Sequence, residues 1–194
     1  GGVYDKTWLL FRAYSKSKYD IDLKDIVNPL FASAPILYKK MQDDSLQAAI
    51  NFWHFNAKLE SKNIKALIEI SEILKELDIQ KDVSFVGWTF DTKFANENKD
   101  LINAFLKASK ESKEILKNSD EEWNRIKEQM SVKNDKEFEA LKNGYKKGII
   151  EEFDENSIGD LQKVFKILLK EGGEKFVEDA VFLDNNIFWN FDSK

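Results

Sequence analysis

The stretch DIVNPLFASAPILYKKMQDDSLQAAINFWH, residues 25–54, decides the fold that we expect for this chain. Its first seven residues, 25–31, form a short β-rich run, and 46–54 has the pattern of a buried strand. Residues 33–44 between them carry helix signals: Ser33 as the N-cap and Pro35 in the first turn, where a missing N–H costs little. A strand, a helix and a second strand in succession predict a parallel crossover unit.

The alternation continues on both sides of this stretch. Upstream, the apolar spacing over residues 5–19 predicts a helix that Asp5 caps through its carboxylate. Downstream, we expect a helix at 55–63, a strand at 64–70, a helix at 71–79 and a strand at 83–90. After Phe90 the pattern is nearly all helical, with helices expected at 91–118, 120–130, 135–147 and 157–171. Ser119 with Glu122 predicts a capped start for the second of these, and Gly172 with Gly173 the end of the last.

Together these elements predict an α/β fold with a parallel-type sheet. We expect one α/β lobe over residues 1–88, and a return strand with a long helical C-terminal region over 89–194. The 42% hydrophobic content, with 15 Phe and 5 Trp, is enough for a substantial core.

Composition argues against several classes of function. The net charge is −5, and the only arginines are Arg12 and Arg125, so a clustered cationic surface for nucleic acid is not expected. No segment approaches the roughly 20 apolar residues of a membrane span. Cysteine is absent, only His54 represents histidine, and none of the common hydrolase, metalloprotease or phosphate-loop motifs occurs. We therefore expect no enzyme activity, no cofactor and no metal.

The first candidate site is the N-terminal GGVYDKTW, residues 1–8. Gly1 and Gly2 allow a tight turn, and the helix start from Asp5 to Trp8 presents backbone N–H groups to which Thr7 adds a hydroxyl. An anionic ligand is the chemistry that such a helix start favours. An ordinary strand-to-helix turn, or a tag remnant at the glycines, explains the same residues.

The second candidate site follows the strand predicted at 46–54. Asn51, Trp53, His54 and Asn56 lie where that strand ends, and ligands of open parallel sheets bind outside the carboxyl ends of the strands. Trp53 suits stacking on a planar ligand, while His54 and Asn56 offer hydrogen bonds. A structural role for His54 beside its aromatic neighbours is the alternative. Trp88, after Gly87 in a further strand, is interpreted as core packing.

Three segments in order resemble a known family. They are GGVYDKTWLLFRAYSK (1–16), FASAPILYKKMQDDSLQAAINFWHFNAKLE (31–60) and VGWTFDTKFANENKDLINAFLKASKES (86–112). Each is similar to the corresponding part of the substrate-binding proteins of bacterial ABC importers in the nitrate, sulfonate, taurine and thiamine-precursor group. The resemblance covers nearly the whole chain and implies a type II periplasmic-binding-protein-like fold whose first lobe precedes Gly1.

The resemblance also implies a function. It makes the chain the solute-binding component of an importer, which captures a sulfonate- or nitrate-like anion or a pyrimidine-like compound and presents it to the membrane permease. The expected location is the periplasm, or a lipid anchor at the outer face of the cytoplasmic membrane. The implied ligand-binding residues are Gly2, Asp5, Thr7, Trp8, Trp53, His54 and Asn56.

Other functions remain open beside this one. A ligand-sensing effector domain of a regulator shares the two-lobed plan. An enzyme of thiamine-pyrimidine synthesis shares the scaffold, although the cysteine-rich segment expected of it is missing here. Self-association through a surface left by the absent first lobe is a further expectation.

Overall fold

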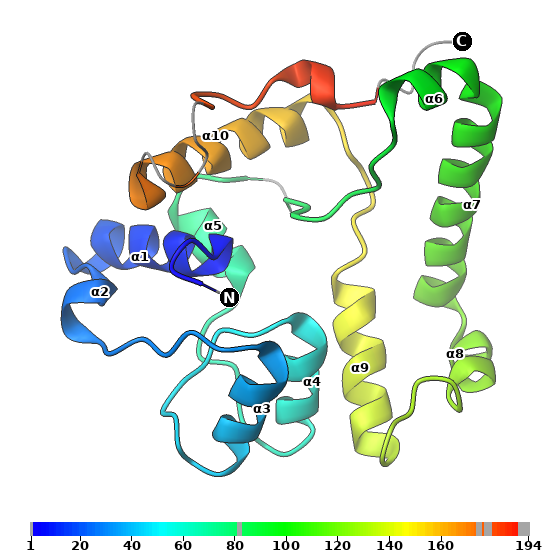
Figure 1. Cartoon of the computed structure of the whole chain (residues 1–194). Helices are drawn as coiled ribbons and strands as arrows, with labels where there is room; N and C mark the ends of the chain where they lie inside the picture. Colours follow the sequence, from blue (N-terminus) through cyan, green and yellow to red (C-terminus); the bar gives the residue numbers. More distant parts are fainter. Residues whose placement is uncertain (1, 81–82, 174–175, 177–179, 190–194) are drawn as a thin grey trace. The chain divides into compact units, whose positions relative to one another are not determined.

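The structure, a computed structural model, describes residues 2–80, 83–173, 176 and 180–189 and divides into two units. Unit 1 comprises Gly1–Val83 and Glu152–Asn185, and unit 2 comprises Ser84–Glu151 and Asn186–Lys194. All regular elements of the described residues are helices, and none is a strand (Figure 1). The expected α/β fold with a parallel sheet, of the type II periplasmic-binding-protein-like kind, is therefore wrong, and the fold of the described residues is helical.

The four predicted strands are replaced by helix ends and irregular segments. The first two residues of the run at 25–31 belong to α2 (Leu23–Ile26), and the last two residues of the run at 46–54 belong to α4 (Trp53–Glu60). The run at 64–70 is irregular until α5 (Ile70–Glu76) begins at its last residue, and the run at 83–90 is irregular throughout. Leu67 and Val86 are 81% and 85% exposed, whereas a strand in a parallel sheet is covered on both faces. Short apolar runs do not by themselves distinguish a buried strand from other apolar segments.

Unit 1 is built around α1 (Lys6–Tyr19), which packs against α5 and α10 (Glu155–Gly172) (Figure 1). Leu9 and Leu10 of α1 are almost completely buried, and burying each such side chain contributes about 1.5–3 kcal/mol. Further buried residues of this core are Ala13, Tyr14, Ile73, Leu74, Ile79, Val164 and Leu168. α3 (Ala34–Gln42) packs separately against α4, where Leu37, Ala57 and Leu59 are buried.

Helix ends follow the capping signals of the sequence. Asp5 caps α1, and Ser33 precedes α3 with Pro35 in its first turn, as predicted. Gly173, in the left-handed region at φ 68°, ends α10. A residue with a side chain is strained at such a φ, which explains why a glycine stands there.

Unit 2 contains the consecutive helices α6 (Thr92–Glu97), α7 (Lys99–Asn118) and α8 (Asp120–Ile126), followed by α9 (Asp135–Lys147). α7 contacts α6 and α8, and Ile102 is its one buried residue (Figure 1). Trp123 of α8 is buried, donates its indole N–H to the Leu116 carbonyl at 2.6 Å and meets the ring of Tyr145 edge-on. A short 3₁₀ turn, Asn185–Ile187, follows near the end of the described chain.

Candidate functional site

The start of α1 has the geometry that its sequence predicts. Asp5 Oδ1 accepts hydrogen bonds from the backbone N–H groups of Thr7, at 3.0 Å, and Trp8, at 3.3 Å. The Asp5 N–H in turn donates to the Gly2 carbonyl at 2.9 Å and closes a turn. Gly1 lies outside the described residues. The carboxylate thus occupies two of the donors that an anion at this helix start would use.

The second candidate group lies at the start of α4. Trp53 is the first residue of this helix, and His54 lies among three aromatic rings: Phe52 stacks on it at 6.0 Å, and Trp53 and Phe55 lie at 5.6 and 4.6 Å. Tyr38 of α3 meets Phe55 at 5.5 Å. We call these five residues, Tyr38, Phe52, Trp53, His54 and Phe55, the α4 aromatic cluster. It presents aromatic rings at different inclinations, mostly apolar, with one imidazole among them.

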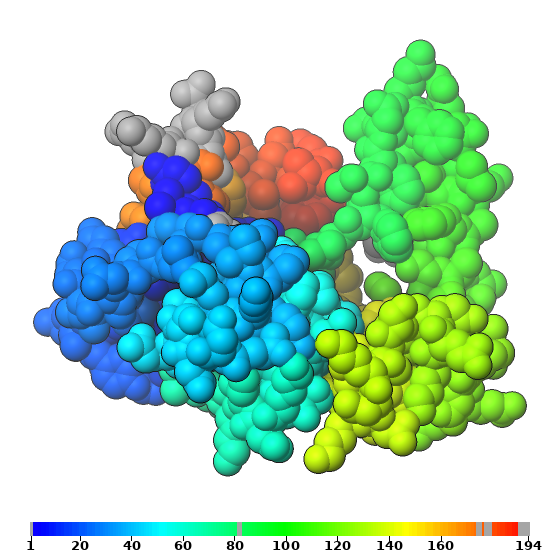
Figure 2. Space-filling model, turned by 60° about the horizontal axis from the view of Figure 1, so that its bottom comes forward, coloured from blue at the N-terminus to red at the C-terminus, as the bar shows by residue number. Residues whose placement is uncertain are grey.

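The α4 aromatic cluster is open to solvent. Trp53 is 49% exposed and Phe52 63% exposed, while His54 and Asn56 are half-buried. The helices that carry the cluster lie at the surface on the face shown in Figure 2, where α3 and α4 appear in light blue to cyan. A ligand that stacks on Trp53 therefore needs no opening of the core.

Segment 28–34 links the two groups within unit 1. Trp8 of α1 meets Phe31 edge-on, with ring centroids 6.4 Å apart. Asn51 donates its side-chain N–H to the Ala34 carbonyl at 3.0 Å, and Asn56 donates to the Asn51 carbonyl at 3.2 Å. The helix starts that carry the residues expected at the ligand are thus connected through this segment.

A buried ionic group holds α1 in place. Arg12 makes a bidentate pair with Asp22, at 2.8 and 2.7 Å, and donates to the Glu171 carbonyl at 3.1 Å. Lys16 pairs with Asp22 at 2.9 Å and with the Glu171 carboxylate at 2.7 Å. The side chains of Arg12, Asp22 and Glu171 are only 10%, 8% and 4% exposed. We call these four residues, Arg12, Lys16, Asp22 and Glu171, the α1 ionic cluster.

The contacts within the α1 ionic cluster shift the pKa values of Asp22, Arg12 and Lys16. The hydrogen bonds from Arg12, together with those from Lys16 and the Lys24 N–H, hold the pKa of Asp22 far below its usual range. The bond to Asp22 raises the pKa of Arg12, and the bonds to Asp22 and Glu171 raise that of Lys16 against the opposing effect of burial. Asp22, Arg12 and Lys16 therefore stay charged at neutral pH. Their bonds tie α1 to Glu171 of α10 and to Asp22 at the start of α2.

Sequence reasoning missed several residues that shape this part of unit 1. Asp22 and Glu171 gave no signal because each is an ordinary acidic residue, and Glu171 is 159 residues from Arg12. Phe31, Tyr38 and Phe55 attracted no attention as single aromatic residues. Their helical or loop spacing indicates packing, and only the fold brings Tyr38 and Phe55 together.

Among the described residues, no three His, Asp or Glu side chains come close enough together to hold a metal ion. In the same part of the chain, no helix combines the length and the apolar character needed to cross a membrane.

Trp88, expected in the core, is instead 60% exposed in unit 2, so that prediction is wrong.

Comparison of the chain with protein-family models and with curated proteins gave no match.

Proposed function

We propose that this chain is the solute-binding component of an ABC-type importer, with the α4 aromatic cluster as part of its ligand-binding wall. Support comes from the three sequence segments that resemble such proteins in order, and from the exposed aromatic and polar side chains of unit 1. The fold itself gives no support, because the sheet that the resemblance implies is not found in the described residues. The observation that carries the proposal is the exposed ring of Trp53 beside a half-buried imidazole and amide. Such a surface offers stacking and hydrogen bonds to a small ligand.

In this role the chain binds and releases its ligand unchanged. A small solute stacks on Trp53 and accepts or donates hydrogen bonds at His54 and Asn56. The membrane permease is the partner that receives the solute, and the location is the periplasm or the outer face of the cytoplasmic membrane. No described contact favours the regulatory or enzymatic alternatives, which stay predictions.

The first experiment is a thermal-shift screen of the chain against nitrate, sulfonates, pyrimidines and small organic acids. A ligand at about 100 times its Kd stabilises the folded state by about 2.7 kcal/mol. That corresponds to a rise in Tm of about 5–10 °C for a chain of this size. A panel in which no compound raises the Tm would refute the proposal.

Site-directed variants locate the binding surface. Trp53→Ala removes the stacking surface, and we expect it to abolish the shift produced by the best ligand. Trp88→Ala is the matched control, because Trp88 is also an exposed tryptophan, at 60% against 49%, but lies in unit 2. An equal loss of the shift in both variants, or an unchanged shift in Trp53→Ala, would exclude the α4 aromatic cluster as the site.

A further inference from the structure

The exposed surface of α7 carries an apolar stripe that the solute-binding role does not use. Leu101, Phe105, Ala108, Ser112 and Ile115 alternate by four and three residues and so lie along one face of the helix. Leu101 and Ile115 are 58% and 51% exposed. We call these five residues the α7 stripe. α7 itself stands at the surface in Figure 2, in bright green.

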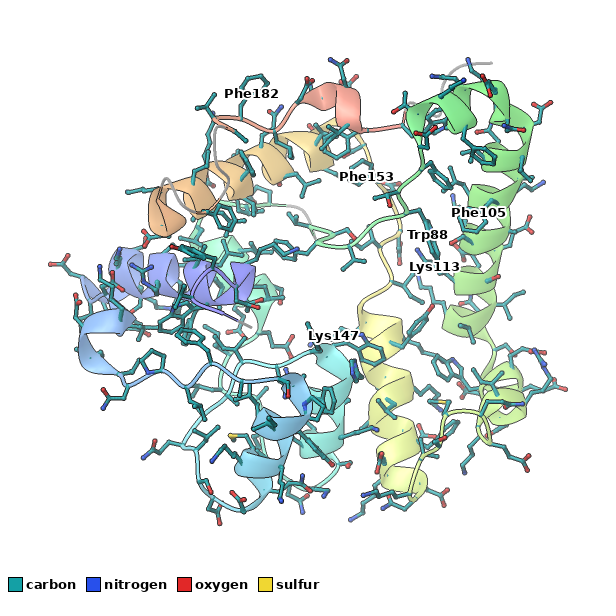
Figure 3. All side chains as sticks on the ribbon, in the orientation of Figure 1. Trp88, Phe105, Lys113, Lys147, Phe153 and Phe182 are labelled. Carbon is teal, nitrogen blue, oxygen red and sulfur yellow. The ribbon has the colours of Figure 1, made fainter. Side chains whose placement is uncertain are left out.

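Trp88 forms one edge of the stripe and is held in a fixed orientation. Its indole N–H donates to Ser109 Oγ at 3.1 Å, and its ring meets Phe105 edge-on with centroids 5.0 Å apart. Figure 3 shows Trp88 and Phe105 pointing toward each other from segment 84–91 and α7. Phe90 also meets Phe105 edge-on, with ring centroids 5.8 Å apart. An ordered surface of this kind loses little side-chain entropy on binding.

We propose that the α7 stripe binds the same stripe of a second copy of this chain, with the two helices antiparallel. A two-fold axis at Ala108 places Leu101 opposite the partner's Ile115, because each lies seven residues from Ala108. The same axis places Ala108 opposite Ala108, and Phe105, three residues from the axis, lies one residue along the pair from the position opposite the partner's Ser112, which is four residues from it. The small central pair lets the helices approach closely, and the large Leu101 and Ile115 meet toward the ends of the stripe.

Charge and area agree with a second copy as the occupant. Lys107 and Glu111 pair with each other along one helix at 3.9 Å and lie at the edge away from Trp88. In the antiparallel pair Lys107 of one copy lies two residues along the helix from the position opposite the partner's Glu111, within reach of its long side chain. With Trp88 60% and Phe105 40% exposed, and about 150–250 Å² per aromatic side chain, the stripe and its edge offer roughly 500 Å² per copy. The total of about 1,000 Å² is at the lower limit of a specific interface. The dimer is consequently weak and concentration-dependent.

A single engineered cysteine tests the axis directly, because the chain contains no cysteine of its own. Ala108→Cys places two thiols across the axis within disulfide distance, and we expect it to form a covalent dimer under mild oxidation. Ser112→Cys is the matched control: it lies on the same stripe, but its copies are eight residues apart along the pair, about 12 Å. Equal cross-linking of the two variants, or none with Ala108→Cys, would overturn the proposal.

The unmodified chain gives an independent measurement. In sedimentation equilibrium from about 5 to 500 µM we expect the mean mass to rise with concentration. We expect Leu101→Glu or Ile115→Glu to raise the dimer dissociation constant by at least about tenfold, because each variant buries a charge in the interface. Lys110→Glu, on the opposite face of α7, should leave the dimer dissociation constant unchanged. A chain that stays monomeric throughout, with or without ligand, overturns the self-association while leaving the solute-binding proposal untouched.

Discussion

Replacing Arg12 by Met removes the central cation of the α1 ionic cluster and should destabilise unit 1. The substitution keeps a long side chain but leaves the carboxylates of Asp22 and Glu171, which are 8% and 4% exposed, with less compensating charge. It also removes the hydrogen bond to the Glu171 carbonyl. Buried carboxylates that lose a cation are costly because little solvent is available to replace it.

The structure sets the expected size of the effect. At an effective dielectric constant of about 20, two charges roughly 4 Å apart attract by about 4 kcal/mol, and burial opposes this gain. Removing one partner of a buried pair costs about 3–5 kcal/mol. Lys16 remains at 2.9 Å from Asp22 and 2.7 Å from Glu171, so we expect the lower end, about 3 kcal/mol.

Calorimetry and urea unfolding followed by circular dichroism measure this change. A loss of about 3 kcal/mol lowers the Tm by about 6–12 °C. Arg125→Met is the matched control, since Arg125 is the other arginine and its pair with Glu122 is exposed, with a side chain 71% accessible. That variant should change stability by at most about 0.5 kcal/mol. If the two variants lose the same small amount, the α1 ionic cluster does not hold unit 1 together.

Three further predictions concern single groups. Folding lowers the pKa of Asp22, so its ionised carboxylate contributes fully to the free energy of unfolding above about pH 4, its unfolded pKa, and this contribution is lost as the pH falls toward the folded pKa. The difference in the free energy of unfolding between the unmodified chain and Asp22→Asn should therefore narrow in acid. A difference that stays constant with pH would contradict this. Asp5→Ala leaves the Thr7 and Trp8 N–H groups without their cap and should cost about 1 kcal/mol in urea unfolding, whereas no change would show that water replaces the cap fully. Trp123→Phe removes the buried bond to the Leu116 carbonyl and should cost about 1–3 kcal/mol with a changed near-UV spectrum of unit 2, and a variant as stable as the parent would contradict that role.

Helices were predictable where the sequence marks their ends. The helix expected over 135–147 matches α9, and the helix expected over 5–19 matches α1 with its cap at Asp5. Each has a polar side chain at its start that accepts from the backbone, which is a local effect. Strands lack such a local mark, because a strand is stabilised by partners elsewhere in the chain. The apolar runs at 25–31 and 46–54 therefore predicted a sheet that the structure does not contain.

The candidate site was predictable in part. The residues Asn51, Trp53, His54 and Asn56 were selected because they follow a predicted strand, whereas in the structure they lie at the start of α4. The α1 ionic cluster was not predictable, because it depends on Glu171, far away in the sequence. The exposure of Trp88 was also missed, since a tryptophan in an apolar run normally indicates the core.

Within the proposed role, the capping of α1 bears on the kind of solute that suits the proposed ligand-binding wall. Asp5 already occupies the Thr7 and Trp8 N–H groups, so an anion at this helix start would meet a carboxylate in its way. At the α4 aromatic cluster, by contrast, Trp53 presents an exposed ring with the imidazole of His54 next to it, at 5.6 Å. A flat heteroaromatic ring gains stacking area there, whereas a nitrate-sized anion gains little. Within the proposed role, we therefore expect pyrimidine-like solutes to bind this wall more tightly than small inorganic anions.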